Sequence, residues 1–489
     1  MKWPKNPKIY EINTWQWLYY LSEKYGQKIT LENVPIEIIE KELTRFDAVW
    51  AMGIWERSPK SKEIALQHKG ILNECEKTLR YFSTNDIIGS PYAIHHYSVD
   101  SYFGGVKALE KFRELLAEYK ILLILDFVPN HVARDHIWTL EKSNLFVKGD
   151  INDLLTKPDE FFSIGGEIYA HGKDPYFPPW TDTIQINAFS LDAREKALKT
   201  LQLIAKQCDG VRCDMAMLVM NDIFKNTWGE RVGPPPDKDY WEDIIPSIKS
   251  DFPDFKFIGE VYWDLEWELI KQGFDFCYDK KLYDRLKEKN VDKIKEHLQA
   301  DLNYQQHLIR FIENHDEQRA IKTLGEEPSM AAATLILTLL GGKLIFNGQM
   351  KGWEVHIPVQ LRRGSDESDN EKVKRYYDKM MKIIDRFKIE NWSLCEIKTI
   401  GGGDLSYKNL IAYTWRKDDE RKLIVINYSQ NHSKAHVIIK DLKYGIKDWC
   451  FKDLYHNKEY VYNGKDLDEF GLYVELNPWN FHLFDIKGY

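Results

Sequence analysis

The sequence predicts an α/β fold: a (β/α)8 barrel with a small domain inserted after the third strand and a C-terminal antiparallel β-sandwich domain. Three observations lead to this prediction. Short apolar or β-branched runs alternate with longer segments of helical periodicity. One connection is far longer than an ordinary loop between a strand and a helix. After Asn391 the chain changes to closely spaced runs of strand length.

Eight apolar runs predict the eight parallel strands that such a barrel requires. They span residues 9–12, 48–52, 122–125, 210–213, 256–258, 274–278, 309–312 and 343–346. Helices are expected between them, for example at 106–118 and 193–205, where apolar residues recur every three or four positions. Parallel pairing follows, because each crossover is long enough to hold a helix.

The predicted domains follow from changes in composition along the chain. Residues 1–131 and 186–390 are expected to form the barrel. Residues 132–185 are rich in Gly and Pro turns, and we expect them to form an inserted domain beside the barrel pocket, since long structured loops are usually functional. Residues 391–489 are expected to form the C-terminal all-β domain, with strands near 409–415, 422–428, 435–439 and 471–476.

Composition and charge narrow the class of protein. The chain has 489 residues, of which 43% are hydrophobic and 29% charged, and no apolar run is long enough to span a membrane. The formal net charge is −8 without a basic block, which argues against a nucleic-acid partner. Six scattered Cys without a CxxC pair predict buried free thiols and a reducing compartment. With no secretory signal at the N-terminus, a cytoplasmic location is expected.

The aromatic content favours one class of ligand. Phe, Trp and Tyr make up 13% of the residues, with 16 Trp. Large aromatic side chains can simply fill a large core. Trp and Tyr also stack on the apolar faces of sugar rings, so the excess leans toward a carbohydrate.

Acidic residues lie in or just after four of the predicted strands. They are Asp126, Asp214, Glu260 and Asp316. The carboxyl ends of barrel strands converge on one pocket, so we expect these side chains to gather there. Arg212 precedes Asp214 by two residues, which places both on the same face of an extended strand. A guanidinium at that position favours the ionised carboxylate.

The chemistry that this cluster suits is the cleavage of a glycosidic bond. That reaction needs two carboxyl groups in opposite protonation states across a sugar ring. Asp214 is expected to be ionised, whereas the apolar neighbours of Glu260 favour its protonated form. Asp316 would face the same ring, and His131 and His315 could donate hydrogen bonds to its hydroxyl groups.

Each motif taken alone has a structural alternative. Arg212 and Asp214 could form an ion pair with no catalytic role, residues 130–131 could be a loop turn, and residues 315–316 could cap the following helix. The histidines and carboxylates could also bind a metal, although no strong ligand spacing is present. Four such endings on barrel strands are difficult to produce by accident, so the catalytic interpretation is favoured.

These four segments resemble the signature regions of the α-amylase family of glycoside hydrolases, in the same order and at similar spacing. They span 126–131, 209–214, 257–260 and 313–316, and further similarity at 89–105 and 477–484 extends over nearly the whole chain. The resemblance implies the same barrel, inserted domain and C-terminal domain. It also implies a retaining α-glycosidase that hydrolyses α-glucans or maltooligosaccharides through a covalent glycosyl-aspartate.

The resemblance assigns a role to each site residue. Asp214 corresponds to the nucleophile, Glu260 to the general acid/base, and Asp316 to the acid that distorts and holds the sugar ring. The substrate-binding residues are Arg212, which positions the nucleophile, the hydroxyl-binding His131 and His315, the stacking Tyr92, and Asp126 as an architectural support.

The chain departs from the family pattern at two positions that bear on substrate length. Met217 and Leu218 replace a Lys-His pair that many endo-acting members carry. Ala93 stands where exo-acting members often have Asp. Neither mode of action is therefore inherited. No cofactor is required by the resemblance, but Asn130 matches a calcium ligand, and with Asp182 as its partner calcium is a candidate.

Two other functions stay open. A transglycosidase, similar to a 4-α-glucanotransferase, would use the same intermediate and pass it to a sugar. Five tryptophans after predicted strands could build its acceptor site: Trp15, Trp17, Trp263, Trp267 and Trp353. A non-catalytic glucan-binding relative is disfavoured, because it would be expected to have lost one of the three acids. The oligomeric state is left open.

Overall fold

The barrel is the main feature of the computed structural model, which describes residues 1–141, 144–387, 390–440 and 442–488. Eight strands close in the order β1-β14-β13-β12-β11-β10-β5-β2. Each predicted strand is confirmed, with its ends within two residues of the expected positions. The strands are β1 (Lys8–Asn13), β2 (Ala48–Met52), β5 (Leu122–Phe127), β10 (Gly210–Cys213), β11 (Lys256–Gly259), β12 (Phe276–Tyr278), β13 (Leu308–Arg310) and β14 (Gly342–Phe346).

The barrel strands are apolar because both of their faces are covered. Every residue of β2 and β5 is buried, as expected of parallel strands enclosed by helices on the outside and side chains on the inside. The register then decides which polar residues meet. Arg212 on β10 lies opposite Asp126 on β5 and Ile258 on β11. Asp126 and Arg212 therefore lie side by side on adjacent strands.

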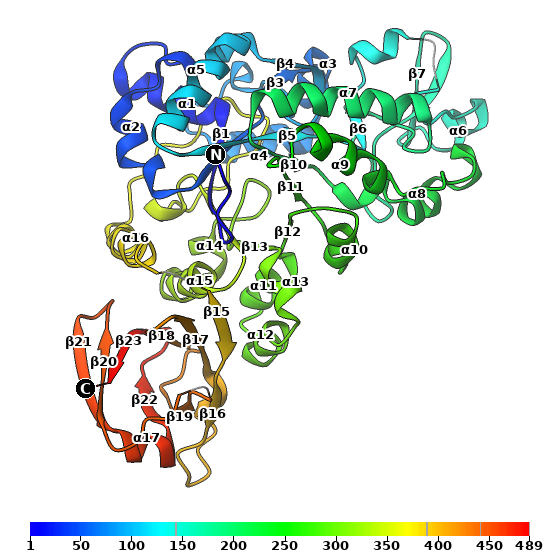
Figure 1. The fold of residues 1–489 in the computed structure, drawn as a ribbon. Helices are drawn as coiled ribbons and strands as arrows, with labels where there is room; N and C mark the ends of the chain where they lie inside the picture. The colour runs from blue at the N-terminus through cyan, green and yellow to red at the C-terminus, as the bar shows by residue number, and fades with distance from the viewer. Residues whose placement is uncertain (142–143, 388–389, 441, 489) are drawn as a thin grey trace. The chain divides into compact units, whose positions relative to one another are not determined.

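Helices alternate with the barrel strands, as Figure 1 shows. The predicted helices are α5 (Gly105–Glu118) and α7 (Leu191–Gln207). Ser190 caps α7 by accepting the amide of Ala193. The others are α1 (Thr14–Tyr25), α2 (Ile36–Lys41), α3 (Pro59–Gln67), α4 (Lys69–Thr78), α6 (Ile151–Thr156), α8 (Asn221–Trp228), α9 (Tyr240–Asp251), α10 (Glu266–Lys271), α11 (Lys280–Lys287), α12 (Val291–Leu298), α13 (Leu302–Gln306), α14 (Ala320–Leu324), α15 (Glu326–Thr338), α16 (Glu371–Ile384) and α17 (Gly464–Phe470).

By compactness the chain divides into two units. The first comprises Met1–Tyr278 with Val355–Asp366, and the second comprises Asp279–Glu354 with Glu367–Tyr489. The domain boundaries expected at residues 132, 186 and 391 follow composition rather than compactness, and they stay a prediction.

The long connection after β5 has a small core of its own. β6 (His131–Ala133) pairs with β9 (Thr183–Gln185), and β7 (Phe161–Ile164) pairs with β8 (Glu167–Ala170), both antiparallel. Their apolar side chains pack into one cluster that includes Val132, Leu145, Phe146, Phe162 and Ile184. A further hairpin joins β3 (Trp55–Arg57) to β4 (Ile94–Val99).

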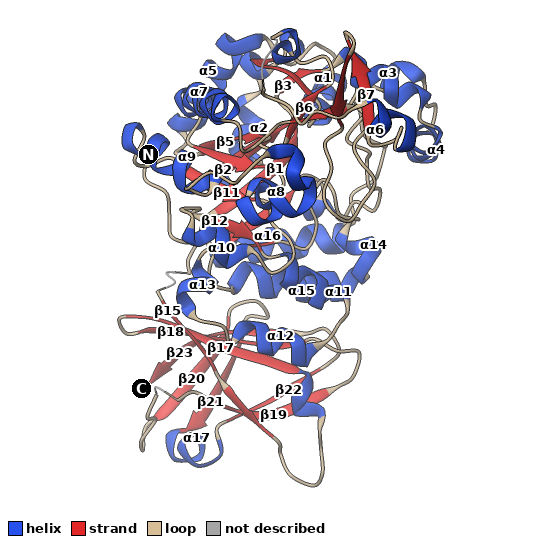
Figure 2. Cartoon of the chain, turned by 90° about the vertical axis from the view of Figure 1, so that its right-hand side faces the viewer, coloured by secondary structure: helices blue, strands red, loops and turns tan. Residues whose placement is uncertain are grey.

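The C-terminal region is antiparallel, which confirms the prediction. One sheet has the order β15-β17-β18-β23-β20-β21 and the other β16-β19-β22, and Figure 2 shows their strands in red. Side chains from both sheets share one apolar core. The strands are β15 (Asn391–Leu394), β16 (Glu396–Lys398), β17 (Leu410–Lys417), β18 (Glu420–Asn427), β19 (Ser433–Ile438), β20 (Asp448–Asp453), β21 (Lys458–Asn463), β22 (Leu472–Leu476) and β23 (Phe481–Gly488).

Two further predictions concern membranes and thiols. Across the described ranges, no helix combines the length and apolar composition needed to cross a bilayer. The six cysteines are free, and all except Cys395 are buried, as the sequence predicted for Cys208, Cys213 and Cys277.

Candidate active site

Arg212 is the centre of a buried charged cluster in the first compact unit. Its Nη1 donates to Asp214 Oδ1 at 2.7 Å, and its Nη2 forms an ion pair with Glu260 Oε2 at 2.8 Å. Asp126 Oδ1 lies 3.9 Å from Nη1. Arg212 is 1% exposed, Asp214 6% and Glu260 3%. Three of the predicted acids thus share one guanidinium, and two of them bind different nitrogens of it.

Asp126 is fixed by donors from the neighbouring strand. Its Oδ1 accepts the indole of Trp50 at 3.1 Å, and its Oδ2 accepts the amide of Gly53 at 3.0 Å. Its carbonyl oxygen accepts the indole of Trp55 at 2.8 Å. Both carboxylate oxygens therefore have donors that belong to the protein, and Asp126 is suited to support the cluster rather than to react.

Glu260 is held at both carboxylate oxygens. Oε2 accepts the amide of Met215 at 2.7 Å in addition to its ion pair with Arg212, and Oε1 accepts the hydroxyl of Tyr262 at 2.8 Å. Met215 has φ +42°, a left-handed conformation that is costly for a residue with a side chain. This strained residue directs its amide at the carboxylate of Glu260.

Three aromatic rings surround the guanidinium of Arg212. Its central carbon lies 5.1 Å from the ring centre of Tyr92, 5.2 Å from Trp50 and 5.8 Å from Tyr278. Its Nε also donates to the hydroxyl of Tyr278 at 3.4 Å. Cation–π contacts in a desolvated site stabilise the positive charge.

The charge of Arg212 is secured by its acidic partners. Burial alone would lower the pKa of the guanidinium, but the carboxylate of Glu260, helped by Tyr92, Tyr278 and Asp214, holds that pKa well above its usual value. Arg212 is therefore a permanent cation. The sequence paired Arg212 with Asp214 alone and predicted apolar surroundings for Glu260. In the structure Arg212 also binds Glu260, whose two carboxylate oxygens both have polar partners.

His315 and Asp316 follow β13 in the second compact unit. His315 Nε2 lies 3.0 Å from Asp316 Oδ2, and the imidazole is buried while the carboxylate is 45% exposed. Asn314 Oδ1 accepts the amides of Asp316 and Glu317 at 3.0 and 2.8 Å. The two predicted site residues thus contact each other, and an Asx turn presents the carboxylate to solvent.

His131 begins β6 and is held in the neutral form. Burial lowers its pKa to about 4, although nearby Asp182 acts in the opposite direction. Its ring lies 4.9 Å from that of Trp180. A neutral imidazole has one N–H donor, which is what binding to a sugar hydroxyl requires.

A family model for the alpha-amylase catalytic domain matches residues 82–387, which is more than half of the chain. The chain belongs to the alpha-amylase family. It is accordingly a glycoside hydrolase. The match includes every predicted site residue.

Known proteins are similar to this chain, in sequence or in fold, over a large part of its length. It is 22% identical over 422 residues to Alpha-amylase 3 of Dictyoglomus thermophilum, covering 74% of this chain and 81% of that protein. Its fold is similar to that of a maltogenic alpha-amylase from Thermotoga neapolitana, with TM-score 0.67, 18% identity and 98% of each chain covered. An alpha-amylase from Geobacillus thermoleovorans, solved with acarbose, also has TM-score 0.67 at 17% identity, covering 100% of this chain and 99% of that one.

The family resemblance suggested calcium near Asn130 and Asp182, where one side-chain oxygen of each residue already has a donor. Asn130 Oδ1 accepts the side-chain amide of Gln185 at 2.9 Å, and Asp182 Oδ2 accepts the hydroxyl of Ser61 at 2.6 Å. Calcium needs six to eight oxygen ligands. The side chains of Asn130 and Asp182 by themselves cannot supply that number.

The tryptophans proposed for an acceptor site differ in exposure. Trp17 is 3% exposed and packs near Phe112, so it cannot reach a ligand. Trp263 and Trp267 are 36% and 38% exposed. Trp263 has φ +64° and meets the ring of Tyr176 edge-on at 4.9 Å. The accessible aromatic surface therefore follows β11, close in sequence to Glu260.

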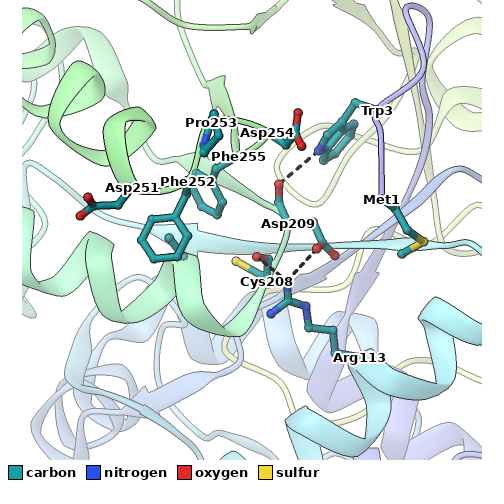
Figure 3. Close-up of a pocket in the computed structure, with 11 residues that line it drawn as sticks. Met1, Trp3, Arg113, Cys208, Asp209, Asp251, Phe252, Pro253, Asp254 and Phe255 are labelled. Carbon is teal, nitrogen blue, oxygen red and sulfur yellow. Dashed lines mark hydrogen bonds and ion pairs between the residues drawn. The ribbon is translucent and has the colours of Figure 1, made fainter.

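A hollow of about 270 Å³ lies near the start of β10, where its strand begins rather than ends (Figure 3). Asp209 lines this hollow. Its carboxylate accepts hydrogen bonds from Arg113 at 2.7 Å and from the amide of Leu123 at 2.9 Å. The carbonyl of Asp209 accepts the indole of Trp3 at 3.2 Å. In barrels of this kind, residues at the amino ends of strands serve stability, so this hollow is separate from the catalytic chemistry.

Sequence reasoning missed several residues of the cluster. Tyr278 was placed on a predicted strand but given no role, although it ends that strand as the acids do. Trp50, Met215 and Tyr262 contribute through single atoms that only the fold brings near the carboxylates. Tyr262 alone carried a signal, since it lies two residues after Glu260.

Proposed function

We propose that this protein is a retaining α-glycosidase that hydrolyses α-glucosidic bonds in α-glucans or maltooligosaccharides. One observation carries the proposal: the guanidinium of Arg212 binds Asp214 through one nitrogen and Glu260 through the other. A retaining mechanism needs two carboxyl groups close enough for direct attack on a sugar between them. Two groups that bind one guanidinium lie close together, which supports this mechanism.

The charges of the cluster give each acid its role. Asp126, Asp214 and Glu260 all lie within 3.9 Å of one guanidinium, so three ionised carboxylates would repel one another in a buried place. Retention of one proton relieves that repulsion, and the acids titrate as a coupled group. Asp214 Oδ1 accepts a hydrogen bond from Arg212 at 2.7 Å, which favours its ionised form, and the family resemblance gives the transferable proton to Glu260. We assign the proton to Glu260.

The reaction proceeds in two displacements. Asp214 attacks the anomeric carbon as Glu260 gives its proton to the departing oxygen, which leaves a glycosyl ester on Asp214. Glu260, now a carboxylate, takes a proton from water, and the oxygen of that water displaces Asp214 from the anomeric carbon. The resemblance gives Tyr92 the stacking contact with the sugar ring and gives His131 a hydrogen bond to one of its hydroxyl groups.

Two variants test the assignment of the acids. Asp214→Ala is expected to abolish the release of reducing sugar from maltooligosaccharides, while Asp222→Ala, on an exposed site of α8, serves as control. Glu260→Gln is expected to lose activity on the same substrates. On an α-glucosyl fluoride, whose leaving group needs no proton, it should still release fluoride in the first turnover, while breakdown of the glycosyl ester stays slow. Wild-type rates in Asp214→Ala would refute the assignment.

Transglycosylation is the second candidate function, supported by the exposed Trp263 and Trp267. Aromatic surface beside the acid/base could hold an acceptor sugar. Chromatography of the products from maltotriose separates the two functions. Longer oligosaccharides would favour transfer, and glucose with maltose would favour hydrolysis.

The cytoplasmic location stays a prediction, and so does the expectation that no cofactor is required although calcium is possible. Cell fractionation tests the first. The second is tested by measuring hydrolysis after chelation and after calcium is returned.

A further inference from the structure

Three side chains able to bind a metal meet at a turn in the C-terminal region, far along the chain from the proposed catalytic residues. Asp453 ends β20, His456 lies in the turn that follows, and His482 lies on the adjacent strand β23. The Nδ1 atoms of His456 and His482 lie 2.8 and 2.6 Å from Asp453 Oδ2. Two imidazoles therefore converge on a single carboxylate oxygen.

The turn positions the carboxylate of Asp453. Asp453 is 0% exposed, and its Oδ1 accepts the amides of Tyr455 and His456, both at 3.0 Å. Because Oδ1 is occupied by the backbone, Oδ2 is the oxygen directed at the imidazoles.

Aromatic rings lie against both imidazoles, and the ring of His456 contacts Tyr455 at 5.1 Å and Phe481 at 5.8 Å. His482 stacks on Phe484 at 4.7 Å, and the ring of Tyr460 lies 6.0 Å away. The side chain of His482 is 15% exposed and that of His456 35%, so an ion can enter past His456. Within the described residues, neither imidazole has a second hydrogen-bond partner. Each is thus free to hold its proton on Nε2 and offer Nδ1 as a ligand.

We propose that Asp453, His456 and His482 bind a divalent transition-metal ion, with zinc as the best match. The ligands are Oδ2 of the carboxylate and Nδ1 of each imidazole, and water completes the coordination. Two nitrogen ligands and one carboxylate oxygen suit zinc and its neighbours, whereas calcium and magnesium prefer oxygen. The ligand atoms need only separate slightly to admit bonds of about 2.0–2.2 Å.

The metal has a structural role in this proposal. It joins the turn after β20 to β23, a strand at the centre of the larger sheet. Binding to the folded chain alone raises stability in proportion to the logarithm of the metal concentration. The inference is independent of the proposed catalytic function, since none of its residues takes part in the reaction.

The test uses the full chain, stripped of metal with a chelator. Zinc, magnesium and calcium are each titrated by calorimetry, and thermal unfolding is followed with and without zinc. The informative variant is His456→Gln, which removes one ligand from a partly exposed position and leaves the buried Asp453 in place. The matched control is His432→Gln, because His432 is a surface histidine of the same region that pairs with Glu475 at 3.0 Å.

We expect the wild type and His432→Gln to bind one zinc ion at this site and to unfold at higher temperature in its presence. His456→Gln should bind zinc at least about tenfold more weakly and lose the shift in unfolding temperature. Cobalt bound to the wild type should show the visible absorption of a low-symmetry site, and His456→Gln should lose it. Equal zinc affinity in wild type and His456→Gln, or no zinc binding by the wild type, would overturn the proposal and leave a hydrogen-bonded turn.

Discussion

The hydroxyl of Tyr262 offers a direct way to test how Glu260 is tuned. It donates to Oε1 at 2.8 Å, while Oε2 is engaged with Met215 and Arg212. A donor at that distance stabilises the carboxylate more than the carboxyl group. Tyr262→Phe removes this donor and keeps the aromatic ring. We therefore expect the proton affinity of Glu260 to rise in this variant.

The size of the effect follows from the strength of such a bond. A hydrogen bond to a charged group contributes about 1.5–3 kcal/mol, and about 1.4 kcal/mol corresponds to one pH unit. The protonated carboxyl group can keep a weaker bond to the same hydroxyl, so the lower end applies. The alkaline limb of kcat/KM, which reports the general acid in the free enzyme, should move to higher pH by about one unit.

The assay is the pH dependence of kcat/KM on maltooligosaccharides for the wild type, Tyr262→Phe and a control. Tyr97→Phe is the matched control, because the hydroxyl of Tyr97 accepts the amide of Val128 at 3.0 Å and donates to its carbonyl at 3.3 Å, away from Glu260. Its loss should lower stability and leave the alkaline limb in place. An alkaline limb that stays fixed in Tyr262→Phe, or moves to lower pH, would refute the reasoning.

Three further predictions concern charge and ions. Arg212→Met removes the cation between the buried acids and should lower the free energy of unfolding by about 3–5 kcal/mol at pH 7. Urea unfolding at pH 5 should show a smaller loss, because the acids take up protons. His131 has a folded pKa of about 4, below its unfolded value, so the unfolded chain binds the proton first and stability falls as pH drops from about 6.5 to about 4. The wild type should lose roughly 3 kcal/mol more than His131→Asn over that range, and equal losses would contradict the assignment. Because Asn130 and Asp182 already have hydrogen-bond donors, calcium returned after chelation with EGTA should leave the rate of hydrolysis unchanged, and a restored rate would show a site elsewhere.

The barrel was predictable because its strands are fully buried. β2 and β5 read as continuous apolar runs, and this burial makes their boundaries visible. The C-terminal strands were found only in part. β21 exposes most of its residues at the edge of a sheet, so its composition does not differ from that of a loop. Strands β15, β16, β20 and β23 also mix polar and apolar residues, and they too were missed.

The sequence by itself determined the barrel, the acids at the strand ends and the pairing of Arg212 with Asp214, because spacing along a strand fixes which side chains share a face. Only the tertiary structure decided that Glu260 binds the same guanidinium, that Met215 and Tyr262 hold its carboxylate, and that Trp17 is out of reach of a ligand. The physical reason is that hydrogen bonds and burial depend on the angle and distance between elements remote in the chain. Local pattern specifies an element and its faces, whereas the packing of several elements specifies which atoms meet.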